Sequence, residues 1–297
     1  MLYLSYFIYM QQPNLQPGGF NVMPDVVKNL LIINVLVMLA VPAFQTAFNL
    51  DLNKLLGLHL WLAPDFRLYQ FITTMFAHGS FTHLLFNMFT LWMFGSVLEN
   101  LWGPRRFLTF YLLTGIGASA LYSLTSYIEL YPDIALLNAY LANPSADTLW
   151  QLTQNHRFVV SEGIDFDMYN RYRQFSETFA AFNNQPDNQL LLNNISAFLS
   201  NYKDYFLNLR VAVGASGAVY GLLMAYGMLF PNQVVYVYFL FPIKIKYLVL
   251  ILGIVALSMG LSNSPGDNVA HFAHLGGMLF GFLLIKYWQY KGKNRFR

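Results

Sequence analysis

Cysteine is absent from the 297 residues, and charged side chains are scarce. Without cysteine the chain has no disulfide, no thiolate metal site and no cysteine nucleophile. Only 10% of its residues are charged, against about 25% in an ordinary soluble domain. A net charge of +3 spread over this length makes no basic face of the kind that nucleic acids bind. The composition therefore excludes a nucleic-acid-binding protein and argues against soluble domains.

What the sequence has instead is long apolar stretches. Hydrophobic residues make up 56% of the chain and aromatic residues 18%, which is typical of neither a disordered nor a soluble protein. A membrane span needs about 20 mostly apolar residues, and six stretches qualify: residues 30–47, 78–98, 107–127, 211–230, 245–261 and 269–287. The apolar run Val234–Phe241 is too short to span and predicts an interfacial segment before the fifth span.

The distribution of basic residues predicts the orientation of these spans. With the N-terminus in the cytoplasm, ten Lys and Arg residues fall in short inner segments, and only Lys54 and Arg67 fall in the first outer loop. The positive-inside rule then predicts six spans with both ends in the cytoplasm. We expect a cytoplasmic segment 1–28, a membrane core 29–127 and 210–290, an extracytoplasmic insertion 128–209 and a basic cytoplasmic tail 291–297. Translation from Met1 and from Met10 both remain open.

The insertion between the third and fourth spans differs from the rest in composition. Residues 129–204 carry nine acidic and four basic side chains. Apolar residues recur there at helical spacing and predict an amphipathic helix: Leu191, Ile195, Phe198, Leu199, Tyr202, Phe206 and Leu209. Two interpretations stay open, a lid packed on the outer membrane face and a cap that docks a substrate.

Three polar clusters lie inside apolar stretches, where unpaired polar groups cost free energy and so mark sites. The first holds His78, His83 and Asn87. His83 and Asn87 are four residues apart, so they share one helix face, and both can donate hydrogen bonds. Taken alone, such a pair is more often an interhelical contact than a catalytic group.

The second cluster is Gly214–Gly221, in which Ser216 stands among small residues at the start of an apolar helix. Its hydroxyl is not shielded, and its backbone N–H lies in a first helical turn, where N–H groups are unsatisfied and favour negative charge. Gly217 and Gly221 form a G-x-x-x-G face that lets another helix approach closely. Packing alone would also explain this pattern.

The third cluster contains His274, Gly277 and Gly281, which lie on roughly one face of the sixth apolar stretch. If the two glycine faces pack together, Ser216 and His274 come within hydrogen-bond reach. Acyl transfer needs a nucleophile, a base and oxyanion donors, and the three clusters supply these at one membrane depth. Asp267 lies seven residues before His274, about 10 Å along a helix, and Glu99 lies near the cytoplasmic end of the second span, so neither can orient the imidazole. A Ser–His dyad is therefore expected, with Tyr220 as a candidate to hold the ring.

These residues resemble the motifs of the rhomboid intramembrane serine proteases. The family pattern is H-x-x-x-N on the second span, G-x-S-G at the start of the fourth and A-H-x-G-G-x-x-x-G in the sixth. This chain has His83–Asn87, Gly214-Ala-Ser216-Gly217 and Ala273–Gly281 in the same order and span positions. The resemblance implies an all-α, polytopic bundle of six transmembrane helices, with the long extracytoplasmic insertion between helices 3 and 4 as an addition.

The resemblance also implies roles for individual residues. Ser216 is similar to the family's nucleophile, His274 to the general base, and His83 and Asn87 to the oxyanion-hole residues. Tyr220 matches the aromatic residue that stacks on the catalytic histidine, and His78 a structural histidine. Gly214, Gly217, Gly277 and Gly281 are the matching glycines of the motifs. The family's Trp-Arg pair in the first loop is matched here by Phe66-Arg67, and His271 has no motif counterpart.

A rhomboid-type activity would cut single-pass transmembrane proteins near the outer face of the plasma (inner) membrane, with the lipid bilayer as the other partner and no cofactor. The alternative within the family is a catalytically silent relative that binds membrane clients. A metal or redox protein that uses His78, His83, His271 and His274 is a weaker alternative, because intramembrane carboxylates and an H-E-x-x-H pattern are missing. A transporter is disfavoured, since spans one to three show no repeat in spans four to six.

Overall fold

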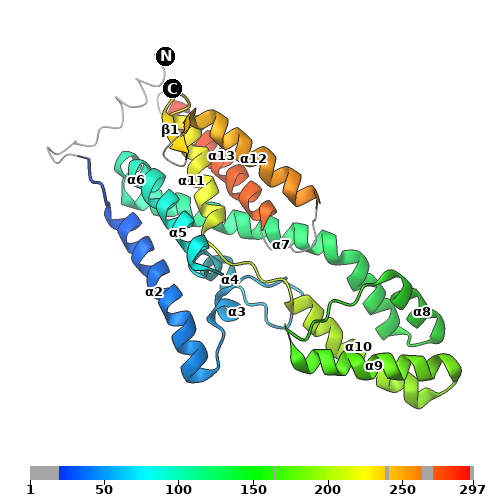
Figure 1. Ribbon diagram of the computed structural model, residues 1–297. Coiled ribbons are helices and arrows are strands. Elements are labelled where there is room, and N and C mark those ends of the chain that lie inside the picture. The colour runs from blue at the N-terminus through cyan, green and yellow to red at the C-terminus, as the bar shows by residue number, and fades with distance from the viewer. Residues whose placement is uncertain (1–19, 164, 238–240, 263–269, 295–297) are drawn as a thin grey trace.

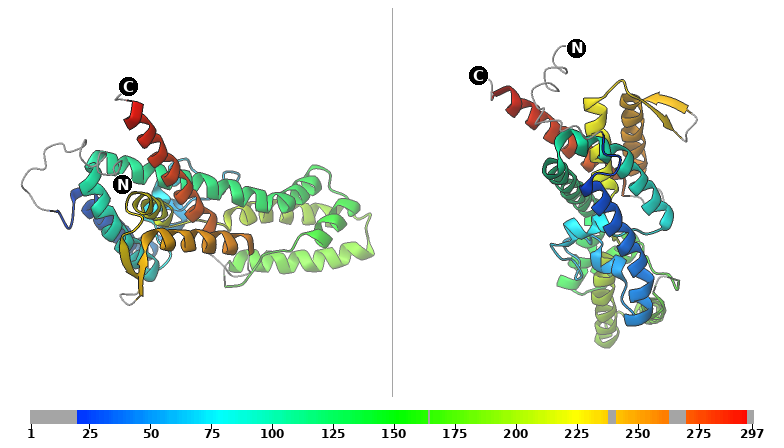
Figure 2. Two further views of the ribbon diagram at one scale, coloured as in Figure 1. Left: turned by 90° about the horizontal axis from the view of Figure 1, so that it is seen from above. Right: turned by 90° about the vertical axis from the view of Figure 1, so that its left-hand side faces the viewer.

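The computed structural model describes residues 20–163, 165–237, 241–262 and 270–294. Most of these residues are helical, and Figure 1 shows two regions, a bundle of long helices and an elongated helical arm at one end. Helix α7 (Pro104–Ala142) runs through both regions and connects them (Figures 1 and 2). Residues 1–19, Asp267 and the last three residues of the basic tail lie outside the described part of the chain.

Within the described part of the chain, four helices are long and apolar enough to cross a membrane. They are α2 (Asp25–Phe48), the continuous helix Phe81–Trp102, α7 (Pro104–Ala142) and α12 (Ile245–Ser262). The helix Phe81–Trp102 consists of α5 (Phe81–Thr90), the π-helical turn η2 (Leu91–Gly95) and α6 (Ser96–Trp102). The remaining two apolar stretches form α11 (Ser216–Leu229) and α13 (His271–Asn294). The length and apolar composition of these helices are those of a membrane protein. The number of six spans stays a prediction.

Two of the observed helices differ from the predicted spans. Helix α11 begins at Ser216 and not at Val211, because residues before it form an extended strap in which Ala212 pairs with Leu58. Helix α7 continues past Tyr127 to Ala142 with Pro132 in its interior. The third predicted span is thus the first part of a helix that extends into the insertion.

The start of α2 is held by a carboxylate from α6. Pro24 precedes α2 and offers no side-chain cap. The buried Glu99 instead accepts hydrogen bonds from the backbone N–H groups of Val26 at 2.9 Å and Val27 at 2.8 Å. A negative charge at a helix N-terminus satisfies unpaired donors and interacts favourably with the helix dipole. This contact gives Glu99 a structural partner at the end of the second apolar helix.

The insertion is built from the end of α7 and three more helices, α8 (Ala146–Asn155), α9 (Phe166–Asn184) and α10 (Gln189–Asn208). Its core is aromatic: Phe175 stacks on Phe198 with ring centroids 4.5 Å apart, and Phe158 lies 4.9 Å from Tyr202. Helix α10 buries the predicted apolar face through Ile195, Phe198, Leu199, Tyr202 and Phe206. The same core includes Leu60 and Ala63 of the first loop, so the insertion packs against that loop.

The first loop contains the short helices α3 (Leu52–Leu56), α4 (Gln70–Thr73) and η1 (Thr74–Phe76). Its centre is the buried Gln70, whose side chain accepts from the N–H groups of His59 and Arg67 and donates to the carbonyl of Asp65. Arg67 itself is exposed and donates from Nη1 to the carbonyls of Pro64 and Phe66. Gln70 therefore organises this loop. Nothing in the sequence pointed to this role.

Two paired strands precede α12, where the sequence predicts an interfacial segment of unspecified structure. Strands β1 (Val234–Val237) and β2 (Phe241–Lys244) pair antiparallel, with Val234 opposite Lys244 and Tyr236 opposite Pro242. A two-stranded sheet places Pro242 on an edge, where the missing N–H is tolerated. Strand β2 leads directly into α12, which is the fifth predicted span.

Candidate active site

The site begins with the packing of α11 against α13 (Figure 1). A methyl group on Gly277 would overlap the carbonyl oxygen of Gly217, and one on Gly281 would stand 2.8 Å from the carbonyl oxygen of Gly221. Only glycine lets the two backbones come this close. The glycine faces predicted from the sequence are therefore the contact surface between these helices, as expected for packing through small residues in membranes.

This close packing brings Ser216 and His274 together. Ser216 is the first residue of α11, and its Oγ lies 2.9 Å from Nε2 of His274 on α13. The distance fits a nucleophile with its general base. Both side chains are only half-buried, so neither is sealed in the bundle.

The imidazole of His274 is held by an aromatic ring in place of a carboxylate. The ring of Tyr220 is parallel to it, with centroids 4.1 Å apart and an interplanar angle of 5°. Tyr220 lies one turn after Ser216 on α11, so a single helix supplies both the hydroxyl and the stacking ring. The stack fixes the plane of the imidazole while Nε2 faces Ser216.

The strap before Ser216 is fixed by the first loop. Ala212 exchanges backbone hydrogen bonds with Leu58, and the hydroxyl of Thr74 donates to the carbonyl of Ala212 at 2.7 Å. The N–H of Gly214 donates to the carbonyl of Thr74 at 2.9 Å. Thr74 therefore anchors the strap twice, two and four residues before the serine. The sequence offered no signal for Thr74 beyond its place in the first loop.

His83 and Asn87 lie beside Gly214. The backbone of Gly214 has φ +128°, a conformation that favours glycine, and a methyl group there would stand 2.6 Å from the His83 ring and 3.7 Å from the Asn87 amide nitrogen. Both predicted donors on α5 are thus within contact of a residue two positions before Ser216.

His78 orients Asn87. Its Nε2 lies 3.1 Å from the amide nitrogen of Asn87, and its ring meets the ring of His83 edge-on with centroids 5.1 Å apart. When the amide donates to Nε2, one of its two hydrogens is used and the second remains free. His78 is buried, which fits the structural role that the resemblance implies.

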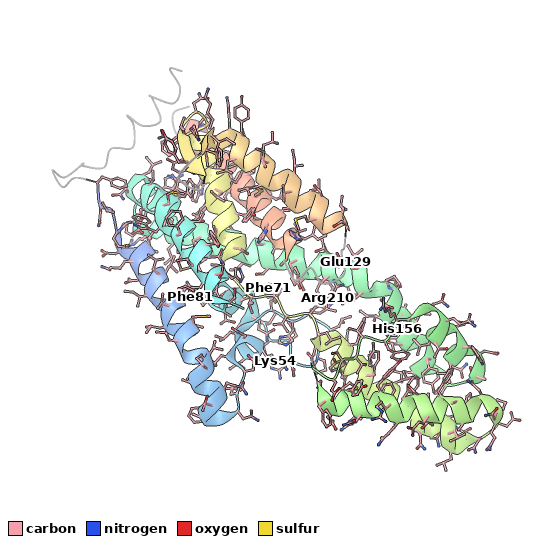
Figure 3. The ribbon with its side chains drawn as sticks, in the orientation of Figure 1. Lys54, Phe71, Phe81, Glu129, His156 and Arg210 are labelled. Carbon is pink, nitrogen blue, oxygen red and sulfur yellow. The ribbon has the colours of Figure 1, made fainter. Side chains whose placement is uncertain are left out.

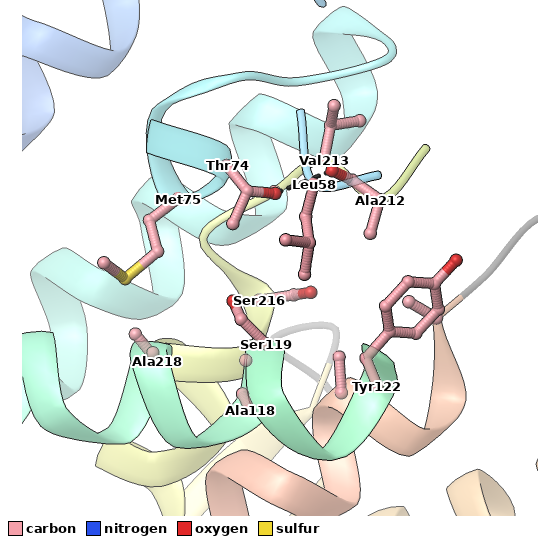
Figure 4. A pocket seen from close by; sticks show the side chains of 15 residues that line it. Leu58, Thr74, Met75, Ala118, Ser119, Tyr122, Ala212, Val213, Ser216 and Ala218 are labelled. Carbon is pink, nitrogen blue, oxygen red and sulfur yellow. Dashed lines mark hydrogen bonds between the residues drawn. The ribbon is translucent and has the colours of Figure 1, made fainter. Parts of the chain in front are cut away.

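A small cavity opens next to Ser216 (Figure 4). It lies between the strap, the first loop and α7, where Thr74, Ser119 and Tyr122 line it. Its volume of about 20 Å³ is enough for about one water molecule. The arrangement can thus supply a nucleophile, a base, several N–H donors and room for water at one point.

Two other predicted groups are placed differently. His271, the first residue of α13, meets His274 edge-on with centroids 6.1 Å apart. Phe66 and Arg67 lie in the first loop, where the ring of Phe66 packs edge-on against that of Phe71. Among the residues that the structure describes, no three His, Asp or Glu side chains gather closely enough to hold a metal ion.

Comparison with known proteins identifies the family. The model of the Rhomboid domain matches residues 65–129 and 187–290, together more than half of the chain. The match includes the strap, α5, α11 and α13, and it leaves out most of the insertion.

Individual relatives match over shorter segments. RHOMBOID-like protein 4 of Arabidopsis thaliana is 43% identical over 79 residues, which are 27% of this chain and 18% of that protein. The chloroplastic Rhomboid-like protein 11 of the same plant is 41% identical over 51 residues, 17% of this chain and 18% of that protein. The chain thus spans less than a fifth of the length of either relative. The match to the domain model, over more than half of its residues, shows that this chain belongs to the rhomboid family.

Proposed function

We propose that this protein is an intramembrane serine protease that cleaves single-pass transmembrane proteins near the outer membrane face. The observation that carries the proposal is the 2.9 Å contact between Ser216 Oγ and His274 Nε2, with Tyr220 stacked on the imidazole. A packing contact alone would need neither an aligned hydroxyl and imidazole nor a ring that fixes the imidazole plane. Family membership supports the same reading.

In the proposed reaction, Ser216 Oγ attacks the scissile carbonyl carbon while its proton passes to His274 Nε2. The carbonyl oxygen gains the negative charge, and His83, Asn87 and the Ser216 backbone N–H donate to it. Collapse of this intermediate breaks the C–N bond, and His274 returns the proton to the leaving amine. Prearranged donors of this kind contribute about 2.7–4 kcal/mol each in other acyl-transfer enzymes.

Water completes the cycle. It attacks the acyl ester on Ser216, His274 accepts its proton, and the carboxylic acid product leaves as Ser216 regains its hydrogen. The cavity beside Ser216, lined by Thr74 and Ser119, supports this step because it can hold water at membrane depth. The substrate helix must unwind locally first, since its carbonyl groups are otherwise hydrogen-bonded within the helix.

The proposed membrane topology uses all six apolar helices, with α11 and α13 as the fourth and sixth spans. Both termini lie in the cytoplasm of the plasma (inner) membrane, and the dyad lies toward the outer side. At about 1.5 Å per residue, the 14 residues of α11 cover only part of the hydrocarbon thickness. The extended strap completes that path, which supports a site below the outer surface.

For the insertion, residues 128–209, we propose a lid on the outer face. Its aromatic core incorporates Leu60 and Ala63 of the first loop, and Arg210 pairs with Glu129 where the insertion rejoins the strap. These contacts support a part that holds the first loop and the strap together.

The test is labelling of the detergent-purified protein with a fluorescent fluorophosphonate, which reacts with activated serines. We expect the wild type and Ser258→Ala to be labelled, because Ser258 donates to its own helix backbone and lies on α12. Ser216→Ala and His274→Ala should not be labelled. Equal labelling of all four proteins, or none of a folded wild type, would contradict the protease and favour a silent relative that binds membrane clients.

A further inference from the structure

A second cavity, separate from the dyad, lies where α2 ends and the first loop begins. Its volume is about 540 Å³, and Gln45 and Asn49 at the end of α2 form part of its wall. Because α2 is 24 residues long and apolar enough to cross a membrane, the residues after Phe48 lie at a boundary between hydrocarbon and water.

Four charged side chains line this cavity, two of each sign. They are Lys54 and Arg67, and Asp51 and Asp65. No ion pair within 4 Å joins any of these four to another. Arg67 is held by its two bonds from Nη1 to the carbonyls of Pro64 and Phe66, and since a guanidinium has five N–H donors, others remain for a ligand. Figure 3 shows Lys54 in the first loop beside α2.

The lining also includes exposed apolar side chains, which form an apolar rim. Leu50 is 37% exposed, and Leu55 is 41% exposed. Large apolar side chains at a membrane boundary contact acyl chains, while Lys and Arg beside them reach lipid headgroups. The combination of charged lining and apolar rim fits a molecule that is itself charged at one end and apolar at the other.

We propose that this cavity binds the headgroup of a zwitterionic phospholipid that carries a primary ammonium, such as phosphatidylethanolamine. Lys54 and Arg67 hold the phosphate, and Asp51 and Asp65 hold the ammonium, with the acyl chains along Leu50 and Leu55. The lining carries no net charge, which disfavours an anionic headgroup. The exposed apolar rim favours a lipid over free phosphate or phosphoethanolamine. This site uses no residue of the dyad and is independent of the proposed protease activity.

The test measures lipid binding to the full chain in detergent by native mass spectrometry. The probes are dioleoyl phosphatidylethanolamine, dioleoyl phosphatidylglycerol and free phosphoethanolamine. Lys54→Gln/Arg67→Gln removes both cations from the cavity, and Arg157→Gln/Arg173→Gln removes two exposed cations from the insertion with the same change in net charge. Asp65→Asn is a milder variant that removes one carboxylate, and thermal unfolding checks that each variant folds.

We expect one phosphatidylethanolamine to bind at least about fivefold more tightly than phosphatidylglycerol. Lys54→Gln/Arg67→Gln should weaken its binding by about tenfold or more, and Arg157→Gln/Arg173→Gln by less than about twofold. Asp65→Asn should abolish the preference over phosphatidylglycerol, and it carries the test if the double variant does not fold.

Three results would overturn the assignment. Equal losses in the two double variants would mean general charge attraction and no site. Tighter binding of phosphatidylglycerol would mean that the zwitterionic headgroup is wrong. Free phosphoethanolamine that binds as tightly as the lipid would mean a soluble ligand.

Discussion

In the membrane core the closest helix contacts run through glycines, whereas in the insertion they run through aromatic rings. Gly277 touches the Gly217 backbone in the core, and Phe175 stacks on Phe198 in the insertion. Lipid offers no hydrophobic gain for helix association, so small residues that allow close backbone contact are favoured there. In the insertion, which we propose lies outside the bilayer, burial of large rings supplies the stabilisation. The two regions therefore respond to mutation in opposite ways.

The largest effect is expected from Gly277→Ala. The added methyl group would overlap the Gly217 carbonyl oxygen and force α13 away from α11, which separates Ser216 from His274. Overpacking of this kind costs about 1–3 kcal/mol or more, and we expect fluorophosphonate labelling to fall by about 100-fold or more.

The control for this variant is Gly253→Ala on α12, where the nearest neighbour is the Met278 sulfur at 3.5 Å, an ordinary contact. Its labelling should stay close to wild type. Similar losses in both variants would mean that the effect is general to glycines in apolar helices and not specific to the contact of α11 with α13.

The matching variant in the insertion is Phe198→Ala. Removal of a buried aromatic side chain costs about 3–5 kcal/mol, so trypsin should cut the insertion faster at Arg157, Arg171 and Arg173. Ser216 labelling should fall far less than in Gly277→Ala. Leu190→Ala, at a side chain that is 68% exposed, should leave cleavage nearly unchanged. Complete loss of labelling in Phe198→Ala would show that the two regions do not fold separately.

Polar groups sharpen the comparison, because the proposed function assigns Asn87 in the core to chemistry. Asn87→Ala should raise the barrier to turnover by about 2.7–4 kcal/mol, which lowers turnover roughly 100- to 1,000-fold, with little change in KM. Because the variant also leaves the buried His78 without its partner, unfolding should become easier by about 1–3 kcal/mol, too little to account for that loss of turnover. Cleavage kinetics at saturating substrate measure this, with the exposed Asn201→Ala on α10 as the control. Equal turnover in Asn87→Ala and wild type would remove Asn87 from the oxyanion site.

In the insertion a polar group should instead serve stability. Burial raises the pKa of the Tyr202 hydroxyl, so it stays protonated; it lies 2.9 Å from His156 Nε2 and accepts from the Val159 N–H at 3.0 Å. Tyr202→Phe leaves both groups unpaired, at a cost of about 1–3 kcal/mol, and turnover should not change. The exposed Tyr131→Phe is the control, and an unchanged trypsin cleavage rate in Tyr202→Phe would contradict the role.

The sequence was informative where local pattern determines the contact. Glycines four residues apart define a helix face, so spacing predicted that Ser216 and His274 meet if the two glycine faces pack together, and the structure shows that they do. The resemblance to the family rested on the same motifs. The helical spacing of apolar residues likewise predicted the buried face of α10. The catalytic roles of these residues remain predictions.

The features that sequence reasoning missed depend on the folded structure and not on a local sequence pattern. Gln70 and Thr74 are ordinary polar residues in the sequence, and only the fold places them against Asp65 and the strap. Helix α7 continues through Pro132, where a proline is usually expected to end a helix. The pairing of β1 with β2 was missed because an apolar run of this length fits several structures.

The most direct test of the account is cleavage in a bilayer. Wild type, Ser216→Ala and Ser258→Ala are reconstituted into liposomes with a single-pass membrane protein whose span contains small, helix-destabilising residues, and the products are measured by mass spectrometry. The account predicts one cut near the outer end of that span by wild type and Ser258→Ala, and none by Ser216→Ala. Cleavage that persists in Ser216→Ala, or its absence in a wild type that fluorophosphonate labels, would contradict an intramembrane protease built on this serine.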